Sequence, residues 1–166
     1  MLNLNAVVSQ KIEVSPGLII LRLVPDGWEL PDFKSGQFSV LGLPGTARRN
    51  NCADPEPELK QPDKLIRRAY SVSSAAVTKE YIEFYITMVS SGALTPRIFA
   101  LEQGDRIYLS PKFTGLFTLD MVDPGSNIVM LGTGTGLAPY MSMLRANMPC
   151  NSPRKYIRKT GRSTFI

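Results

Sequence analysis

The chain has 166 residues, of which 43% are hydrophobic and 20% are charged, a composition typical of a globular protein with one core and part of a second. It contains no histidine and two cysteines, which excludes histidine-based catalytic triads and predicts neither a metal site nor a disulfide framework. No window is apolar enough to cross a bilayer, and the first residues lack a signal-peptide pattern, so we expect a cytoplasmic protein with no membrane association.

The net charge of +5 is concentrated at the C-terminal end. Within residues 145–166 there is no acidic residue, and the basic ones are Arg145, Arg154, Lys155, Arg158, Lys159 and Arg162. A nucleic-acid partner would therefore have to be bound by this short segment alone, and we do not expect one.

The first part of the chain is rich in β-strand patterns. Residues 5–14 and 17–24 are two strand-like runs on either side of a Ser-Pro-Gly turn, and residues 36–42 predict a third strand. Four prolines and a lack of periodicity predict that residues 44–66 form a long surface loop inserted between strands.

Further strands follow the loop, at residues 67–74 and 81–89. In the second of these, apolar residues alternate with polar ones at the two-residue period of a strand. Strands are also expected at residues 105–110 and 115–119. Short strands at this spacing favour a small antiparallel barrel.

One short helix interrupts the strands, at residues 96–101. Thr95 precedes Pro96, which predicts that the Thr95 hydroxyl caps the helix and that proline occupies its first position. We expect this helix to pack on the barrel.

A glycine-rich turn follows the apolar run Ile128 to Leu131, which we expect to be a buried strand. Glycines at 132, 134 and 136 lead into a predicted helix over residues 136–145. Glycine lets the backbone approach an anion, and a helix start presents unpaired N–H groups, so the pattern predicts a phosphate-binding turn. The spacing departs from Gly-x-Gly-x-x-Gly, and a flexible connector remains the alternative.

Three motifs occur in the order found in plant- and bacterial-type ferredoxin–NADP reductases: Arg68-Ala69-Tyr70-Ser71, Gly92 to Thr95, and Gly132 to Pro139. The chain resembles that family over about residues 1–145. The resemblance implies a mainly β fold: a Greek-key FAD-binding barrel with a capping helix at 1–123, with 44–66 as its inserted loop. It also implies the first strand, turn and helix of a truncated α/β NADP-binding domain at 124–146, and a basic, irregular tail at 147–166.

The resemblance assigns roles to the first motif. Arg68 would neutralise the flavin diphosphate, Tyr70 would stack on the isoalloxazine ring, and Ser71 would hydrogen-bond near its reactive nitrogen and guide hydride transfer. Tyr70 and Ser71 are therefore the expected catalytic residues, and Ala69 completes the motif. Read without its context, the motif is also consistent with a strand edge that carries a buried tyrosine.

The remaining cofactor-binding residues follow from the same resemblance. A diphosphate would bind at the start of the short helix, the nicotinamide half of NADP(H) would enter at the glycine turn beside the flavin, and one tyrosine would lie beside the flavin nucleotide. These residues are Gly92, Ala93, Leu94, Thr95, Gly132, Thr133, Gly134, Thr135, Gly136 and Tyr85. A simple helix cap at Thr95 and surface packing of Tyr85 are the structural alternatives.

The implied function is electron transfer between NADPH and ferredoxin or flavodoxin through FAD. A doubly wound nucleotide domain needs on the order of 100 further residues, whereas residues 146–166 remain, so we expect a truncated form with impaired NADPH turnover. We expect such a form to expose apolar surface and to aggregate or to bind a partner. The alternatives are a non-catalytic flavin-binding or electron-relay module without its own pyridine-nucleotide domain, and a barrel that binds nucleic acid through its basic tail.

Overall fold

The computed structural model describes residues 3–56, 64–123, 126–146 and 164–165. Most of them form a six-stranded antiparallel sheet with the strand order β4-β3-β6-β1-β2-β5. Its strands are β1 (Ala6–Ser15), β2 (Leu18–Pro25), β3 (Phe38–Pro44), β4 (Leu65–Ser71), β5 (Ile82–Thr87) and β6 (Arg106–Leu109).

The sheet curls until its two edge strands meet. Val72, just past β4, forms an antiparallel bridge with Phe84 of β5, and this bridge joins the first strand of the sheet order to the last. The predicted small antiparallel barrel is thereby confirmed.

The barrel core is built from alternate positions of its strands. Leu21 of β2 lies opposite Phe84 of β5, and both side chains are fully buried, as are Ile107 and Leu109 of β6. Since successive side chains of a strand point to opposite faces, the two-residue apolar period of β5 places its apolar side inside. Burial of each large apolar side chain contributes about 2 kcal/mol to folding.

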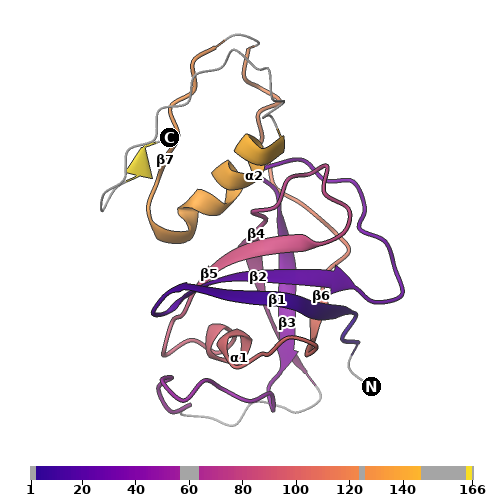
Figure 1. Cartoon of the computed structure of the whole chain (residues 1–166), viewed down its shortest axis with the longest axis vertical. Helices are drawn as coiled ribbons and strands as arrows, with labels where there is room; N and C mark the ends of the chain where they lie inside the picture. Colours follow the sequence, from indigo (N-terminus) through magenta and orange to yellow (C-terminus); the bar gives the residue numbers. More distant parts are fainter. Residues whose placement is uncertain (1–2, 57–63, 124–125, 147–163, 166) are drawn as a thin grey trace.

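Helix α1 (Thr95–Phe99) closes one end of the barrel, with Ile98 fully buried in the core (Figure 1). The predicted capping role of Thr95 is wrong, because the helix begins at Thr95 itself and Leu94 is its N-cap, without a side-chain cap bond. The Thr95 hydroxyl instead accepts from the Val89 N–H at 3.0 Å and donates to the Val89 carbonyl at 3.2 Å. Thr95 therefore closes the loop before the helix.

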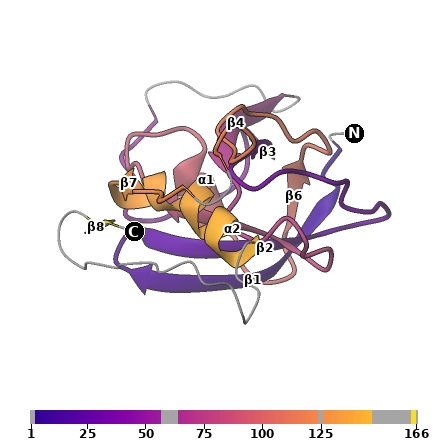
Figure 2. The same ribbon diagram turned by 90° about the horizontal axis from the view of Figure 1, so that it is seen from above.

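The second helix, α2 (Ala138–Ala146), follows the 3-10 turn η1 (Gly134–Leu137) and lies over the opposite end of the barrel (Figures 1 and 2). Its residues Ser142 and Met143 are buried, and the Ser35 hydroxyl donates to the Ser142 carbonyl at 3.1 Å. Within the described ranges, no helix is long and apolar enough to span a membrane.

Two predicted strands are absent. Residues 115–119 form no strand. The pairing with β3 ends at the bridge between Thr114 and Phe38, and Leu116 is fully exposed. The run from Ile128 to Leu131 is not a buried strand either, since Val129 is 77% exposed. An apolar run becomes a buried strand only where other strands flank it, and the described residues supply one short partner.

That partner is β8 (Thr164–Phe165), which pairs with β7 (Leu131–Gly132). The rest of the predicted basic tail, residues 147–163 and 166, lies outside the described residues.

Candidate functional site

Strand β4 runs from one end of the barrel to the other. Beside its start, the Gly45 carbonyl accepts a hydrogen bond from Arg97 of α1 at 2.5 Å. Just past its end, the Ser73 carbonyl accepts from Arg145 of α2 at 2.9 Å. Seven residues of strand span roughly 20 Å, so the strand that carries the Arg-Ala-Tyr-Ser motif links the two helical ends.

The two-residue period of β4 puts Arg68 and Tyr70 on one face and Ala69 and Ser71 on the other. Arg68 is exposed, and its Nη1 donates to the Arg67 carbonyl at 2.7 Å. It pairs with no carboxylate in the part of the chain that the structure describes, so most of its five N–H donors are available to an anion.

Tyr70 is partly buried and packs against the barrel core. Burial raises the pKa of its phenol to about 12, while the nearby charge of Arg68 acts in the opposite direction. The ring is therefore neutral at physiological pH and presents a flat, apolar surface. Ser71 is the last residue of β4 and lies opposite Phe38 of β3.

Strand β5 brings a third predicted residue to the same end of the barrel. Its Phe84 bridges Val72, which follows Ser71, and Tyr85 is the next residue along β5. The strand also packs against η1, which contains Thr135. The end of β4, the middle of β5 and the glycine turn therefore meet beneath α2.

The glycine turn itself is compact. Gly134 has a φ of +53°, and the Gly136 N–H donates to the Thr133 carbonyl at 2.9 Å. A Cβ on Gly132 would lie 3.0 Å from the Tyr140 ring and 3.2 Å from the Gly136 carbonyl oxygen. A side chain at position 132 would therefore be tight, and the Tyr140 ring or the Gly136 carbonyl would have to shift by a few tenths of an ångström.

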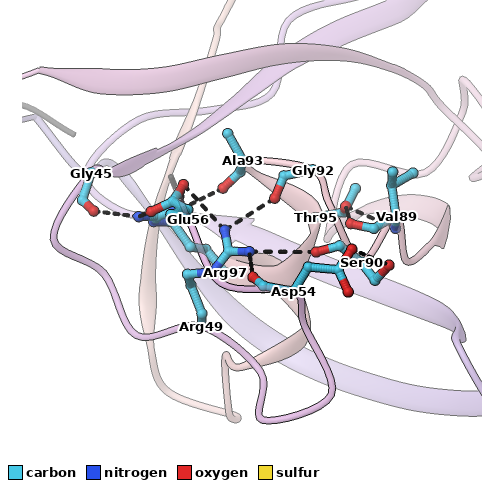
Figure 3. Close-up of polar contacts among 10 residues, drawn as sticks. All are labelled: Gly45, Arg49, Asp54, Glu56, Val89, Ser90, Gly92, Ala93, Thr95 and Arg97. Atoms are coloured by element: carbon cyan, nitrogen blue, oxygen red, sulfur yellow. Dashed lines mark hydrogen bonds and ion pairs between the residues drawn. The ribbon is translucent and has the colours of Figure 1, made fainter. Parts of the chain in front are cut away.

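The Gly92 to Thr95 segment lies at the other end, beside α1, where two arginines hold it (Figure 3). Arg49 donates to the Gly92 carbonyl at 3.1 Å, and Arg97 donates to the Ala93 carbonyl at 2.6 Å. Arg97 is 2% exposed and forms an ion pair with Glu56 at 2.7 Å.

These contacts orient two peptide groups. No peptide bond of the described chain is cis, and in a trans peptide the C=O and N–H groups point in opposite directions. Since the carbonyls of Gly92 and Ala93 point at the arginines, the N–H groups of Ala93 and Leu94 point away from them. Neither N–H has an acceptor among the described residues, and Ala93 is partly exposed whereas Leu94 is buried, so the Ala93 N–H is the more accessible donor for an anion.

Sequence reasoning missed Arg49, Glu56 and Arg97. Proline content marked residues 44–66 as a surface loop, and nothing in its local pattern indicated that Glu56 pairs with a helix 41 residues later. The presence of charged residues such as Arg49 and Glu56 in an irregular loop was the one feature of the sequence that could have suggested ion pairs there. Among the described residues, no group of histidine, cysteine, aspartate or glutamate is arranged to hold a metal ion.

Comparisons with known proteins find ferredoxin–NADP reductases among both the sequence relatives and the solved structures. No family model matches the chain. The flavodoxin/ferredoxin–NADP reductase of Rhodobacter capsulatus is 37% identical over 113 residues, which are 68% of this chain and 36% of the relative. The ferredoxin–NADP reductase of Azotobacter vinelandii is 36% identical over the same share of this chain and 37% of its own length. The chain thus spans little more than a third of the length of these relatives.

A solved structure of similar fold is the ferredoxin–NADP reductase of Neisseria gonorrhoeae with bound FAD and NADP, with a TM-score of 0.70 and 27% identity. The match covers 86% of this chain and 50% of that protein. The reductase of Plasmodium falciparum shares the fold at 24% identity, with a TM-score of 0.63. This chain is therefore, over 68% of its length, a homologue of the ferredoxin–NADP reductases, and its barrel has the fold of that family.

Proposed function

We propose that this chain binds FAD and serves electron transfer between NADPH and ferredoxin or flavodoxin. The observation that carries the proposal is the order of groups along β4: two peptide N–H groups beside α1 that have no acceptor among the described residues, then Arg68, then Tyr70, then the glycine turn under α2. An elongated dinucleotide with a charged centre and a flat ring at one end suits such a row. The names of the homologues supply the partners.

Each residue contributes by position and charge. Arg68 and the N–H groups of Ala93 and Leu94 would neutralise the diphosphate, and the neutral Tyr70 ring would cover a face of the isoalloxazine. Ser71 would hydrogen-bond near the reactive nitrogen of the isoalloxazine and guide hydride transfer, and Tyr85 would lie beside the flavin nucleotide. Bound FAD would supply the exchange between a two-electron donor and one-electron carriers.

We infer that the glycine turn, Gly132 to Gly136, admits the nicotinamide half of NADP(H), with Thr135 on the flavin side. This keeps the layout of a flavin barrel at 1–123 and the start of a nucleotide-binding unit at 124–146. The described part of that unit is one strand pair and one helix, so we propose weak NADPH oxidation for the 166 residues by themselves. A cytoplasmic location remains a proposal based on composition.

Flavin binding is tested by titrating FAD into the purified chain and recording its visible spectrum. Arg68→Ala is expected to weaken FAD binding about 10- to 100-fold, because a charge-assisted hydrogen bond contributes about 1.5–3 kcal/mol. Arg67→Ala is the matched control, since Arg67 lies next in sequence but stacks on the Tyr108 ring, 4.5 Å from its centroid. No FAD binding by the natural chain, or equal losses in both variants, would overturn the assignment.

Anaerobic addition of NADPH separates the two flavin functions. Bleaching of the flavin absorbance supports the reductase. Bound flavin that NADPH does not reduce supports a flavin-binding or electron-relay module without its own pyridine-nucleotide domain.

A further inference from the structure

A buried carboxylate lies where the proposed site is assembled. Glu83 of β5 is 1% exposed, and its side chain is among the fully buried ones of the barrel. An ionised carboxylate in this position is tolerated only where several donors replace water.

Three side chains supply those donors. Arg22 of β2 donates through Nε at 2.9 Å, and the Ser73 hydroxyl donates at 3.0 Å. Arg145, in the last turn of α2, donates at 2.5 Å and also bonds the Ser73 carbonyl at 2.9 Å. One carboxylate thus connects the barrel wall, the segment after β4 and the helix that follows the glycine turn.

The charges in this cluster favour the ionised carboxylate. Burial by itself would raise the pKa of Glu83, but the hydrogen bonds from Arg145, Arg22 and Ser73 and the charge of Arg145 lower it below the ordinary value of 4.5. Arg22 also donates to Gln10 at 2.7 Å and lies over the Tyr81 ring. The contacts described for these two arginines include no second carboxylate that competes with Glu83.

The residues of this cluster lie close in sequence to the predicted flavin-binding residues. Ser73 lies two residues after Ser71, and Glu83 lies two residues before Tyr85. At the other end of the helix from Arg145, η1 packs on β5. Because a nine-residue helix is a rigid rod of about 13 Å, fixing Arg145 also fixes the glycine turn at its start.

We propose that Arg145, Glu83 and Ser73 form a positioning cluster that sets the glycine turn Gly132 to Gly136 at a fixed distance from Tyr70 and Ser71. These three residues act through the helix and the two strands, not by touching a ligand. The proposal rests on the proposed function for what the turn receives, and on the structure for what holds the turn in place.

The central variant is Arg145→Met, which keeps the apolar stem and removes the charge and its bonds. We expect amide hydrogen exchange in α2 to become about tenfold faster, since the helix loses its link to the barrel. We expect FAD affinity to stay within about twofold. The spectral shift that NADP+ causes in the bound flavin should need on the order of tenfold more NADP+.

Two further variants separate positioning from general stability. Arg22→Met removes a donor to the same carboxylate from the barrel side, so it should leave α2 exchange and the NADP+ response unchanged. Arg145→Lys keeps a cation on the helix, so it should retain part of the slow α2 exchange and part of the NADP+ response. Equal effects of Arg22→Met and Arg145→Met, or no effect of Arg145→Met on exchange, would overturn the proposal.

The measurements distinguish failure of the proposed function from failure of the positioning role. If the natural chain binds no FAD, the proposed function fails, and the exchange measurement still decides whether Arg145 anchors the helix. If the chain binds FAD and NADP+ and Arg145→Met loosens α2 without changing the NADP+ response, the positioning role is wrong while the proposed function stands.

Discussion

At the scale of single residues, burial decides what an ion pair contributes. Arg97 and Glu56 are 2% and 17% exposed in their side chains, and Arg97 also bonds the carbonyls of Gly45 and Ala93. The Arg106 to Asp26 pair is about half exposed on both sides. The first pair holds the loop of residues 45–56 against α1, whereas the second remains about half accessible to water.

Arg97→Met is therefore expected to destabilise the fold by about 2 kcal/mol, because it breaks a largely buried ion pair and leaves the carbonyls of Gly45 and Ala93 without this donor, while Arg49 stays paired with Glu56 at 3.2 Å. Arg106→Met should cost less than about 1 kcal/mol, as exposed pairs do. Urea unfolding followed by Trp28 fluorescence measures both. Similar losses in the two variants would show that the Arg97 cluster is not the attachment of the loop.

At the scale of elements, local patterns predicted the barrel because its strands pair with one another inside the described chain. The alternation of Ile82, Phe84 and Ile86 indicated which side of β5 faces the barrel core, and the proline at position 96 marked the start of α1. Each of these features depends on the residue itself and its immediate neighbours.

Other features depend on partners far away in sequence. Val129 belongs to an apolar run that local pattern cannot distinguish from a buried strand, and its exposure follows from the absence of flanking strands among the described residues. The Thr95 hydroxyl, which the local pattern predicted to cap the helix, is instead hydrogen-bonded to the backbone of Val89. The same distinction holds for the site. The Arg68 to Ser71 motif could be identified from the sequence, whereas the contacts of Arg49, Glu56 and Arg97 could not.

The docking of α2 on the barrel depends on one glycine. Gly36 has a φ of +100°, and a Cβ there would lie 1.8 Å from the Phe117 carbonyl oxygen and 2.6 Å from the Met143 side chain. Gly17 has a φ of +76° with nothing within 4 Å of the added atom. Both positions have a positive φ that an alanine would adopt only with strain. Only at Gly36 would the added Cβ also collide with neighbouring atoms.

Gly17→Ala should thus cost about 1–2 kcal/mol, the price of a left-handed conformation for alanine. Gly36→Ala should cost more, by about 1–3 kcal/mol, and should increase hydrogen exchange in α2, because Phe117 and Met143 must move. Melting temperatures and exchange measured on both variants check this. Equal melting temperatures would mean that Phe117 and Met143 adjust without loss.

At the scale of the whole molecule, two segments that meet at Tyr140 carry exposed apolar side chains. Its ring packs edge-on against Phe117 with centroids 5.6 Å apart, and its hydroxyl donates to the Leu131 carbonyl at 2.7 Å. Leu116 is fully exposed, and Phe117, Val129 and Leu131 are 55%, 77% and 59% exposed. We name these four residues the apolar surface.

We expect this apolar surface to drive self-association, since each large apolar side chain removed from water contributes about 1.5–3 kcal/mol. The double variant Leu116→Lys with Val129→Lys should therefore weaken association at least about tenfold in sedimentation velocity over a concentration series. Val77→Lys is the matched control, because Val77 is 73% exposed in the turn between β4 and β5. An unchanged association constant in the double variant would place the contact elsewhere, and equal weakening by Val77→Lys would trace it to net charge instead of the apolar surface.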